Sequence, residues 1–274
     1  MTSSAASNHT SERGLAVVTG ASSGIGLELA RQFAQHDFDL LIAAEDDGIE
    51  LAAEDLRSSG VAVETAQVDL ATPEGVDRLY HRIEEMGRPV EAIALNAGVG
   101  VNGPFLESDL DDHLRLIGLN VTGVVQLSNF VLREMASRGS GRVLFTSSIA
   151  ADMPGSYSAT YNASKAFELS FAQALREELK DSGVSITVLQ PGPTDTKLFE
   201  RSGAAAQDTK VAAGKKDDPA EVAKDGFEAL MAGKDHVVAG SFKNQLQDTM
   251  AQVLPETTKA AMHTKESKPG SARK

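Results

Sequence analysis

Short apolar runs recur along the chain and alternate with longer stretches in which apolar residues return every three or four positions. The short runs are rich in Val, Ile, Leu and Ala and are too brief for typical helices, which favours buried β-strands. The pattern predicts strands at Leu15–Thr19, Asp39–Ala43, Ala62–Gln67, Ala92–Leu95, Arg142–Ser147 and Ser185–Gln190, with His236–Ala239 as a candidate for a last strand.

The longer stretches predict helices near Gly26–Gln35, Ile49–Ser58, Pro73–Met86, Leu110–Ser137, Ala159–Asp181 and Pro219–Met231. Alternation of strands and helices at this spacing indicates βαβ units, and therefore a parallel sheet with helices on both faces. We expect a single α/β domain over residues 14–263, with a doubly wound, mostly parallel, Rossmann-like sheet. Such a sheet binds ligands beyond the carboxyl ends of its strands, where the strand order reverses.

Three segments depart from this alternation. Residues 198–216 are rich in Ala and Gly, follow a strand and precede a helix, so they should lie over the carboxyl ends of the strands. We interpret them as a substrate lid, with a plain surface excursion as the alternative. Residues 1–13 and 264–274 are predicted to be flexible tails.

Composition narrows the functional classes. No apolar run is long enough to span a bilayer, and the N-terminus lacks the pattern of a signal peptide, so we expect a cytoplasmic protein without a membrane partner. The absence of cysteine excludes disulfides, thiolate chemistry and Cys-ligated zinc. A formal charge of −13 opposes nucleic-acid binding. The six histidines are scattered, and we expect no metal site.

A glycine-rich turn follows the first strand and leads directly into a helix. Its glycines allow the tight turn, close approach of a pyrophosphate to the backbone, and close packing of helix against strand. The helix N-terminus adds unpaired N–H groups that favour phosphate. The predicted phosphate-binding residues are Gly20, Ser22, Ser23, Gly24, Ile25 and Gly26.

Three consecutive acids, Glu45, Asp46 and Asp47, end the second strand. A carboxylate at this place, Glu45 in our prediction, can accept hydrogen bonds from the adenosine ribose and repel a 2′-phosphate. This favours NAD slightly over NADP. The alternative is a solvated acidic turn without a ligand.

Tyr161 and Lys165 lie one helical turn apart on one face of a predicted helix. An ammonium beside a phenol lowers the pKa of the phenol and makes it a usable acid or base. Chance also places Tyr and Lys together on helices, but other polar groups accompany this pair. A serine pair that includes Ser148 ends a buried strand, Asn96-Ala97-Gly98 ends another, and Asn120 lies in a long apolar helix, where a buried amide needs a partner.

These motifs resemble the short-chain dehydrogenase/reductase family in its compact single-domain branch. The resemblance runs from about Gly14 to Pro193, and less distinctly to about Val238. It covers the TGxxxGxG turn at Thr19–Gly26, the Asn-Ala-Gly signature, YxxxK at Tyr161–Lys165 and a PGxxxT sequence at Pro191–Thr196. The family often has Asn where this chain has Leu95, a change that we expect to cost one local hydrogen bond.

The resemblance implies an oxidoreductase that interconverts an alcohol and a carbonyl with NAD or NADP. Tyr161 would exchange the proton, Ser148 would hold the substrate oxygen, and Lys165 would lower the tyrosine pKa and contact the nicotinamide ribose. Asn120 would position a water that relays protons towards Lys165. The implied cofactor contacts also include Asp69, Leu70, Asn96, Ala97, Gly98, Pro191, Gly192, Thr194 and Thr196. Family members usually pair through two long helices, so a homodimer or homotetramer is expected.

The substrate is a small molecule that the sequence does not identify. Enoyl reductases resembling this family have a wider Tyr-to-Lys spacing, and sugar-nucleotide epimerases of the broader family are longer. The expected pocket residues outside the lid are mostly apolar and none is basic: Val99, Val101, Phe105, Ile149, Met153 and Tyr157. A catalytically silent nucleotide-binding sensor or scaffold of the same fold is the alternative function, although such a protein should lack part of the tetrad.

Overall fold

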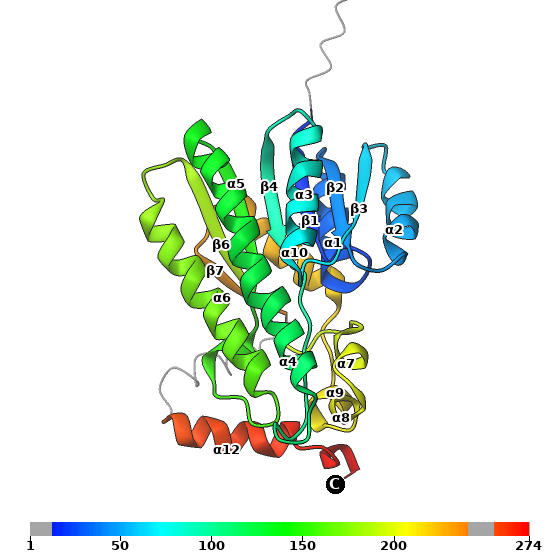
Figure 1. Ribbon diagram of the computed structural model, residues 1–274, viewed down its shortest axis with the longest axis vertical. Coiled ribbons are helices and arrows are strands. Elements are labelled where there is room, and N and C mark those ends of the chain that lie inside the picture. Colours follow the sequence, from blue (N-terminus) through cyan, green and yellow to red (C-terminus); the bar gives the residue numbers. More distant parts are fainter. Residues whose placement is uncertain (1–12, 241–254, 274) are drawn as a thin grey trace, which may run out of the picture.

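The structure, a computed structural model, describes residues 13–240 and 255–273 and contains one seven-stranded sheet (Figure 1). Its order is β3-β2-β1-β4-β5-β6-β7, and every neighbouring pair is parallel. The strands are β1 (Leu15–Thr19), β2 (Asp39–Ala44), β3 (Val63–Gln67), β4 (Val90–Leu95), β5 (Gly141–Thr146), β6 (Val184–Pro191) and β7 (His236–Ala239). The predicted Rossmann-like sheet is confirmed, and each predicted strand end lies within two residues of the observed one.

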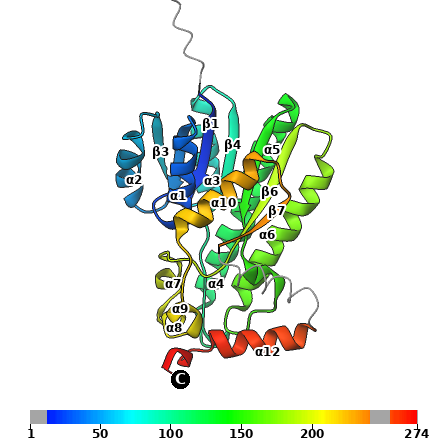
Figure 2. The same cartoon turned by 180° about the vertical axis from the view of Figure 1, so that it is seen from behind.

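Helices cover both faces of this sheet, as Figures 1 and 2 show from opposite sides. One layer contains α1 (Gly24–Gln35), α2 (Gly48–Arg57) and α10 (Pro219–Met231), and the other contains α3 (Pro73–Glu85), α5 (Val124–Arg138) and α6 (Ala159–Glu178). Successive strand residues point to opposite faces, so Val18 and Ile42 join the first core and Val17 and Leu41 the second. Burial of both faces explains why the strands are continuous apolar runs.

Local signals in the sequence fix several helix ends. Thr72 caps α3 by accepting a hydrogen bond from the N–H of Gly75, and Pro73 occupies the first turn. Asp218 caps α10 in the same way. At the other end of a helix, Gly139 stops α5 in a left-handed conformation with φ of 78°.

The stretch predicted as one long helix is interrupted. It comprises α4 (Leu110–Ile117), a π-helical segment η1 (Gly118–Gly123) and α5. Two glycines of η1 pack directly on the loop after β3, since a Cβ at Gly123 would lie 2.3 Å from the carbonyl oxygen of Leu70. By length and apolar content alone Leu110–Arg138 meets the requirements for a membrane span, but in this fold Leu127, Val131 and Met135 of α5 are part of the apolar core.

The segment after β6 forms three short helices, α7 (Leu198–Arg201), α8 (Ala204–Gln207) and α9 (Lys210–Ala213), beyond the carboxyl ends of the strands. The helix α12 (Glu256–Ser267) and the turn η3 (Ser271–Arg273) lie beside them at this end of the molecule (Figure 2). Of the predicted N-terminal tail, residues 1–12 lie outside the described residues.

The prediction of a loose tail from residue 264 is wrong where the structure describes it. Ser267 and Ser271 are buried, the Gly270 N–H donates to the Asp208 carbonyl at 2.9 Å, and the hydroxyl of Ser271 accepts from the N–H of Lys210 at 3.0 Å. Because backbone and hydroxyl groups, rather than apolar side chains, hold this segment in place, it has no apolar periodicity from which its packing could be predicted.

Candidate active site

A pocket of about 720 Å³ opens beyond the carboxyl ends of the strands, at the point between β1 and β4 where the strand order reverses. Residues from the ends of six strands (β1 to β6), from the lid segment and from α12 line it. The predicted site residues that line it are Gly20, Ser22, Ser23, Gly24, Ile25, Glu45, Asp69, Leu70, Asn96, Ala97, Gly98, Ser148, Tyr161, Lys165, Pro191, Gly192, Thr194 and Thr196. Gly26 and Asn120 are buried behind the lining.

The glycine turn between β1 and α1 requires glycine for steric reasons. Gly20 and Gly24 have φ of 69° and 58°, in the left-handed region that disfavours side chains. A Cβ at Gly26 would lie 2.2 Å from the carbonyl oxygen of Gly20, so the first helical turn packs directly on the strand end. Ser23, at the N-cap of α1, makes no side-chain capping bond, which leaves the N–H groups of the first turn directed toward the pocket.

Hydrogen bonds join the ends of β1 and β4 beneath this turn. The hydroxyl of Thr19 accepts from the N–H groups of Asn96 and Ala97 at 2.9 and 3.0 Å. The amide of Asn96 donates to the Thr19 carbonyl at 3.2 Å. Leu95, the position that departs from the family pattern, has its side chain in the apolar core. The Asn-Ala-Gly segment therefore fixes the floor of the pocket.

Tyr161 and Lys165 extend from the first turns of α6 toward Ser148, at the end of β5. The Lys165 ammonium lies 6.0 Å from the centre of the Tyr161 ring. Burial is the largest influence on the pKa of Tyr161 and raises it. The charge of Lys165 and a hydrogen bond with Ser148 lower this pKa, and the carboxylate of Glu168 raises it. The net shift of the Tyr161 pKa is upward. Lys165 acts on the tyrosine in the predicted direction, but burial outweighs it.

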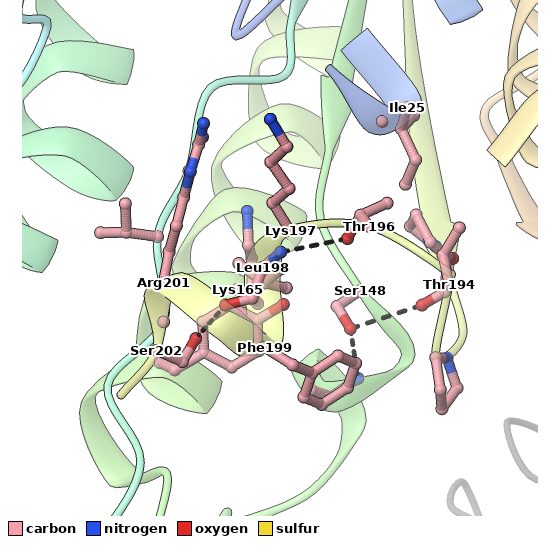
Figure 3. A pocket seen from close by; sticks show the side chains of 18 of the residues that line it. Ile25, Ser148, Lys165, Thr194, Thr196, Lys197, Leu198, Phe199, Arg201 and Ser202 are labelled. Carbon is pink, nitrogen blue, oxygen red and sulfur yellow. Dashed lines mark hydrogen bonds between the residues drawn. The ribbon is translucent and has the colours of Figure 1, made fainter. Parts of the chain in front are cut away.

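Ser148 also begins the short 3-10 helix η2 (Ile149–Asp152). Its hydroxyl accepts from the N–H of Ala150 at 3.1 Å and donates to the Pro191 carbonyl at 3.4 Å. These contacts hold the hydroxyl at the rim shared by β5 and β6 (Figure 3). Ser147, the alternative in the serine pair, instead donates to the Lys165 carbonyl at 2.8 Å and is buried.

Asn120 lies in the π-helical segment and is fully buried. Its side-chain oxygen accepts from the N–H of Val99, and its amide donates to the Val99 carbonyl and to the hydroxyl of Ser164, all at 3.0 Å. The widened π turn directs this amide between the loop after β4 and helix α6. A Cβ at Gly98 would lie 3.4 Å from both the Asn120 oxygen and the Lys165 ammonium, so glycine keeps the space between them open.

Two arginines reach the acidic end of the pocket. The guanidinium of Arg115, on α4, bonds to both Glu45 and Asp69, at 2.8 Å for its shorter contact with Asp69. This hydrogen bond lowers the pKa of Asp69. Arg201, on α7, pairs with Asp46 at 3.1 Å. The local sequence showed three acids and no base, but the fold supplies two bases from distant segments.

The loop after β6 forms the opposite wall. Thr194 pairs with Asp217 in an isolated parallel bridge and donates its hydroxyl hydrogen to the Gly192 carbonyl at 2.9 Å. Thr196 packs against the glycine turn, because a Cβ at Gly24 would lie 2.9 Å from its methyl carbon. Of the four predicted residues of this loop, Thr196 therefore contacts the glycine turn.

The lid segment contributes basic as well as apolar groups. Figure 3 shows Lys197, Leu198, Phe199 and Arg201 at the same pocket as Ser148 and Lys165. The expected lining residues outside the lid include no basic side chain, but Lys197, just before the lid, and Arg201, Lys210 and Lys215 within it add positive charge to the pocket. Of the predicted apolar residues, Val99, Ile149 and Met153 line this pocket, whereas Val101, Phe105 and Tyr157 do not.

Helix α12, which the sequence analysis did not predict, closes one end of the pocket. His263, Glu266 and Ser267 line the pocket. The Lys259 ammonium donates to the Asp152 carbonyl at 3.1 Å, and His263 bonds to the Ser156 carbonyl at 3.0 Å, so α12 is tied to the loop before α6. Among the residues that the structure describes, no cluster of His, Asp and Glu suits a metal ion.

Comparisons with known proteins agree with this geometry. The model of the family described as short chain dehydrogenase matches residues 14–207. An uncharacterized oxidoreductase of Staphylococcus saprophyticus is 33% identical over 218 residues, which cover 79% of this chain and 90% of the relative.

Two similar proteins of known structure contain a bound nicotinamide nucleotide. A short-chain dehydrogenase from Sphingobium yanoikuyae in complex with NADPH is 29% identical, with a TM-score of 0.76 over 82% of this chain and 87% of that protein. A short chain dehydrogenase/reductase from Burkholderia phymatum in complex with NAD is 25% identical, with a TM-score of 0.74 over 83% of this chain and 89% of that one. Similar proteins therefore bind either nucleotide.

Proposed function

The chain belongs to the short-chain dehydrogenase/reductase family of nicotinamide-dependent oxidoreductases, and on that basis we propose that it interconverts an alcohol and a carbonyl with Tyr161 as the acid and base. The observation that carries the proposal is the meeting of Tyr161, Lys165 and Ser148 in one pocket with the glycine turn. The cofactor supplies hydride transfer.

The residues present fit a nicotinamide dinucleotide. The glycine turn leaves a cradle that side chains would fill, at the N-terminus of α1, where the pyrophosphate would bind. Glu45 would hold the adenosine ribose, Asp69 and Leu70 the adenine, and Asn96–Gly98 the middle of the cofactor. Lys165 would bind the nicotinamide ribose. Pro191, Gly192, Thr194 and Thr196 would hold the carboxamide end.

Tyr161 would donate its phenolic proton to the carbonyl oxygen during reduction and accept the hydroxyl proton during oxidation. Ser148 would hold the same oxygen by a hydrogen bond; its hydroxyl is already fixed at the rim of β5 and β6. Because the phenol is buried and its pKa is raised, the protonated form prevails near neutral pH. The protonated phenol is the form that can donate to a carbonyl oxygen in the reduction.

Asn120 would support the proton path behind Tyr161. Its oxygen and the Lys165 ammonium border the same space beside Gly98, which supports the expected water relay. Its three hydrogen bonds also keep the loop after β4 against α6. We therefore propose two roles for Asn120: it would hold a water that relays protons towards Lys165, and it would keep the loop after β4 in contact with α6.

We further propose a preference for NAD over NADP. The support is Glu45, a carboxylate at the ribose end that would repel a 2′-phosphate. Arg115 lies against the same carboxylate and reduces this repulsion, so the preference should be modest. Homo-oligomerisation also stays a prediction; the exposed apolar side chains of Leu110, Leu114, Ile117 and Val125 on α4 to α5 support it.

The decisive test is Tyr161→Phe, with Tyr80→Phe as the matched control. Turnover of a panel of ketones and alcohols is followed by nucleotide absorbance, and nucleotide binding by fluorescence. We expect Tyr161→Phe to lower kcat by roughly 10²- to 10⁴-fold and to leave nucleotide affinity nearly unchanged. Tyr80 lies on the exterior of α3, so its variant should keep full activity. Retained turnover in Tyr161→Phe would contradict the mechanism, and failure of the wild type to bind either nucleotide would contradict the function.

A further inference from the structure

A buried carboxylate lies directly behind the proposed catalytic pair. Glu168 follows Lys165 by three positions on α6, and the two side chains are 3% and 6% exposed. The Lys165 ammonium lies 2.9 Å from each carboxylate oxygen of Glu168 and 2.9 Å from the Thr146 carbonyl of β5. An ammonium has three protons, so the Glu168 carboxylate and the Thr146 carbonyl can engage two of them and leave one for the proposed ribose contact.

This ion pair is not needed to close the core. Burying two charges costs free energy that their attraction often only balances, and apolar residues of similar volume stabilise a core equally well. Elsewhere on the sheet-facing side of α6 the fold uses such residues, for example Ala172. Within the described part of the chain, Lys165 is the cation that pairs with Glu168. The position of Glu168 therefore points to an effect on Lys165 itself.

We propose that Glu168 is a positioning residue that holds the Lys165 ammonium against β5 and shares its charge with Tyr161, and thereby sets the pH range in which Tyr161 exchanges its proton. The proposal rests on the proposed function for its catalytic meaning. Its physical content, an electrostatic link from Glu168 through Lys165 to Tyr161, exists in the protein without substrate or cofactor.

The charges that face Tyr161 give the sign of this link. Lys165 stabilises the phenolate, and the carboxylate of Glu168 opposes that effect. Burial raises the pKa of Glu168 to about 7, against the opposing effect of Lys165. The groups that face the cluster from β5 and η1 are the Thr146 carbonyl, Ser147 and Asn120, which carry no charge. His113 of α4 bonds to Thr160 instead.

Protonation of Glu168 below about pH 7 would thus leave the charge of Lys165 uncompensated beside Tyr161. Replacement by glutamine should have the same effect at every pH, because glutamine keeps the shape and a hydrogen-bond acceptor but removes the negative charge. The Tyr161–Lys165 pair then loses its first proton at lower pH.

Ultraviolet titration of tyrosinate measures this directly, since the chain has three tyrosines and no tryptophan. Tyr161→Phe identifies the Tyr161 transition, and Tyr80→Phe identifies that of Tyr80, whose pKa is raised to about 12 by its hydrogen bond to Glu134. We expect Glu168→Gln to lower the Tyr161 transition by roughly one pH unit or more. Glu168→Asp, which retains the charge, should restore it toward the wild-type value.

Glu177→Gln is the matched control, since Glu177, near the end of α6, forms an exposed ion pair with Lys180, three positions further along the chain. An unchanged Tyr161 transition in Glu168→Gln, or an equal shift in Glu177→Gln, would overturn the proposal. If Glu168→Gln does not fold, the ¹³Cζ resonance of Tyr161 in the wild type decides. It should show an inflection near pH 7 as Glu168 titrates, and a flat response would overturn the proposal.

These titrations use neither substrate nor nucleotide. A wild type without turnover would therefore contradict the proposed function while the Glu168 link could still be measured. In an active enzyme, the pH profile of kcat should move with the Tyr161 transition, and a purely structural role of Glu168 would not produce that shift.

Discussion

The acidic end of the pocket predicts opposite effects for two neighbouring substitutions on nucleotide preference. Glu45→Gln removes a negative charge from the proposed ribose site, whereas Arg115→Gln removes the positive charge that pairs with Glu45 and Asp69. The first variant should bind NADPH better relative to NADH than the wild type does. The second should bind it worse, because two carboxylates lose their counter-ion.

Solvent exposure sets the size of these effects. The side chains of Glu45 and Arg115 are 48% and 41% exposed, so water screens them strongly. A 2′-phosphate of charge near −2 at roughly 6 Å, with an effective dielectric constant of ~60, interacts with a unit charge by about 1.8 kcal/mol. This free energy corresponds to roughly a twentyfold change in the ratio of the two dissociation constants.

The assay is the fluorescence of the reduced nucleotide itself, titrated with protein at low and at high salt. The changes in the ratio should shrink as salt rises, since exposed charges are screened. Asp47→Asn is the matched control, because Asp47 belongs to the same acidic turn but does not line the pocket. If Asp47→Asn alters the ratio as much as Glu45→Gln, or if both pocket variants move it in one direction, Glu45 is not a ribose ligand.

Two further predictions concern the ends of the pocket. Gly26→Ala would bring a Cβ to 2.2 Å from the carbonyl oxygen of Gly20. We expect it to weaken the binding of NADH and of NADPH. We also expect it to lower the free energy of unfolding, measured by denaturant titration, by about 1–3 kcal/mol. At the other end of the pocket, burial lowers the pKa of His263 below its ordinary value of 6.5. The unfolded chain therefore binds this proton more readily than the folded chain does. The packing of α12 should weaken as the pH falls below about 6.5. Hydrogen exchange of α12 at neutral and mildly acid pH should show this loss of protection, and His263→Gln should reduce its pH dependence.

The architecture could be predicted because its signals are local and repeated. Parallel strands covered on both faces produce unbroken apolar runs such as Leu40–Ala44, which pattern analysis detects. Helix starts such as Pro73 and Pro219 are fixed by capping residues next to them in the chain. The π-helical segment around Asn120 was not predicted, because it depends on the close contact of its glycines with the loop after β3, which the sequence does not show.

The electrostatics of the site depend on the tertiary fold far more than the motifs do. The acidic turn at Glu45 contains no base in its own sequence, yet Arg115 is brought to it from 70 positions away, and Arg201 reaches Asp46 across 155 positions. The charge of Glu168 also depends on the fold for its effect, although Glu168 is only three positions from Lys165 in the sequence. Its spacing from Lys165 was visible in the sequence, but its burial against β5 was not, and burial is what makes its charge act on Tyr161. Motifs thus point to the groups that we propose for proton and hydride chemistry, whereas the proposed pH range and nucleotide preference depend on charges that only the folded chain brings together.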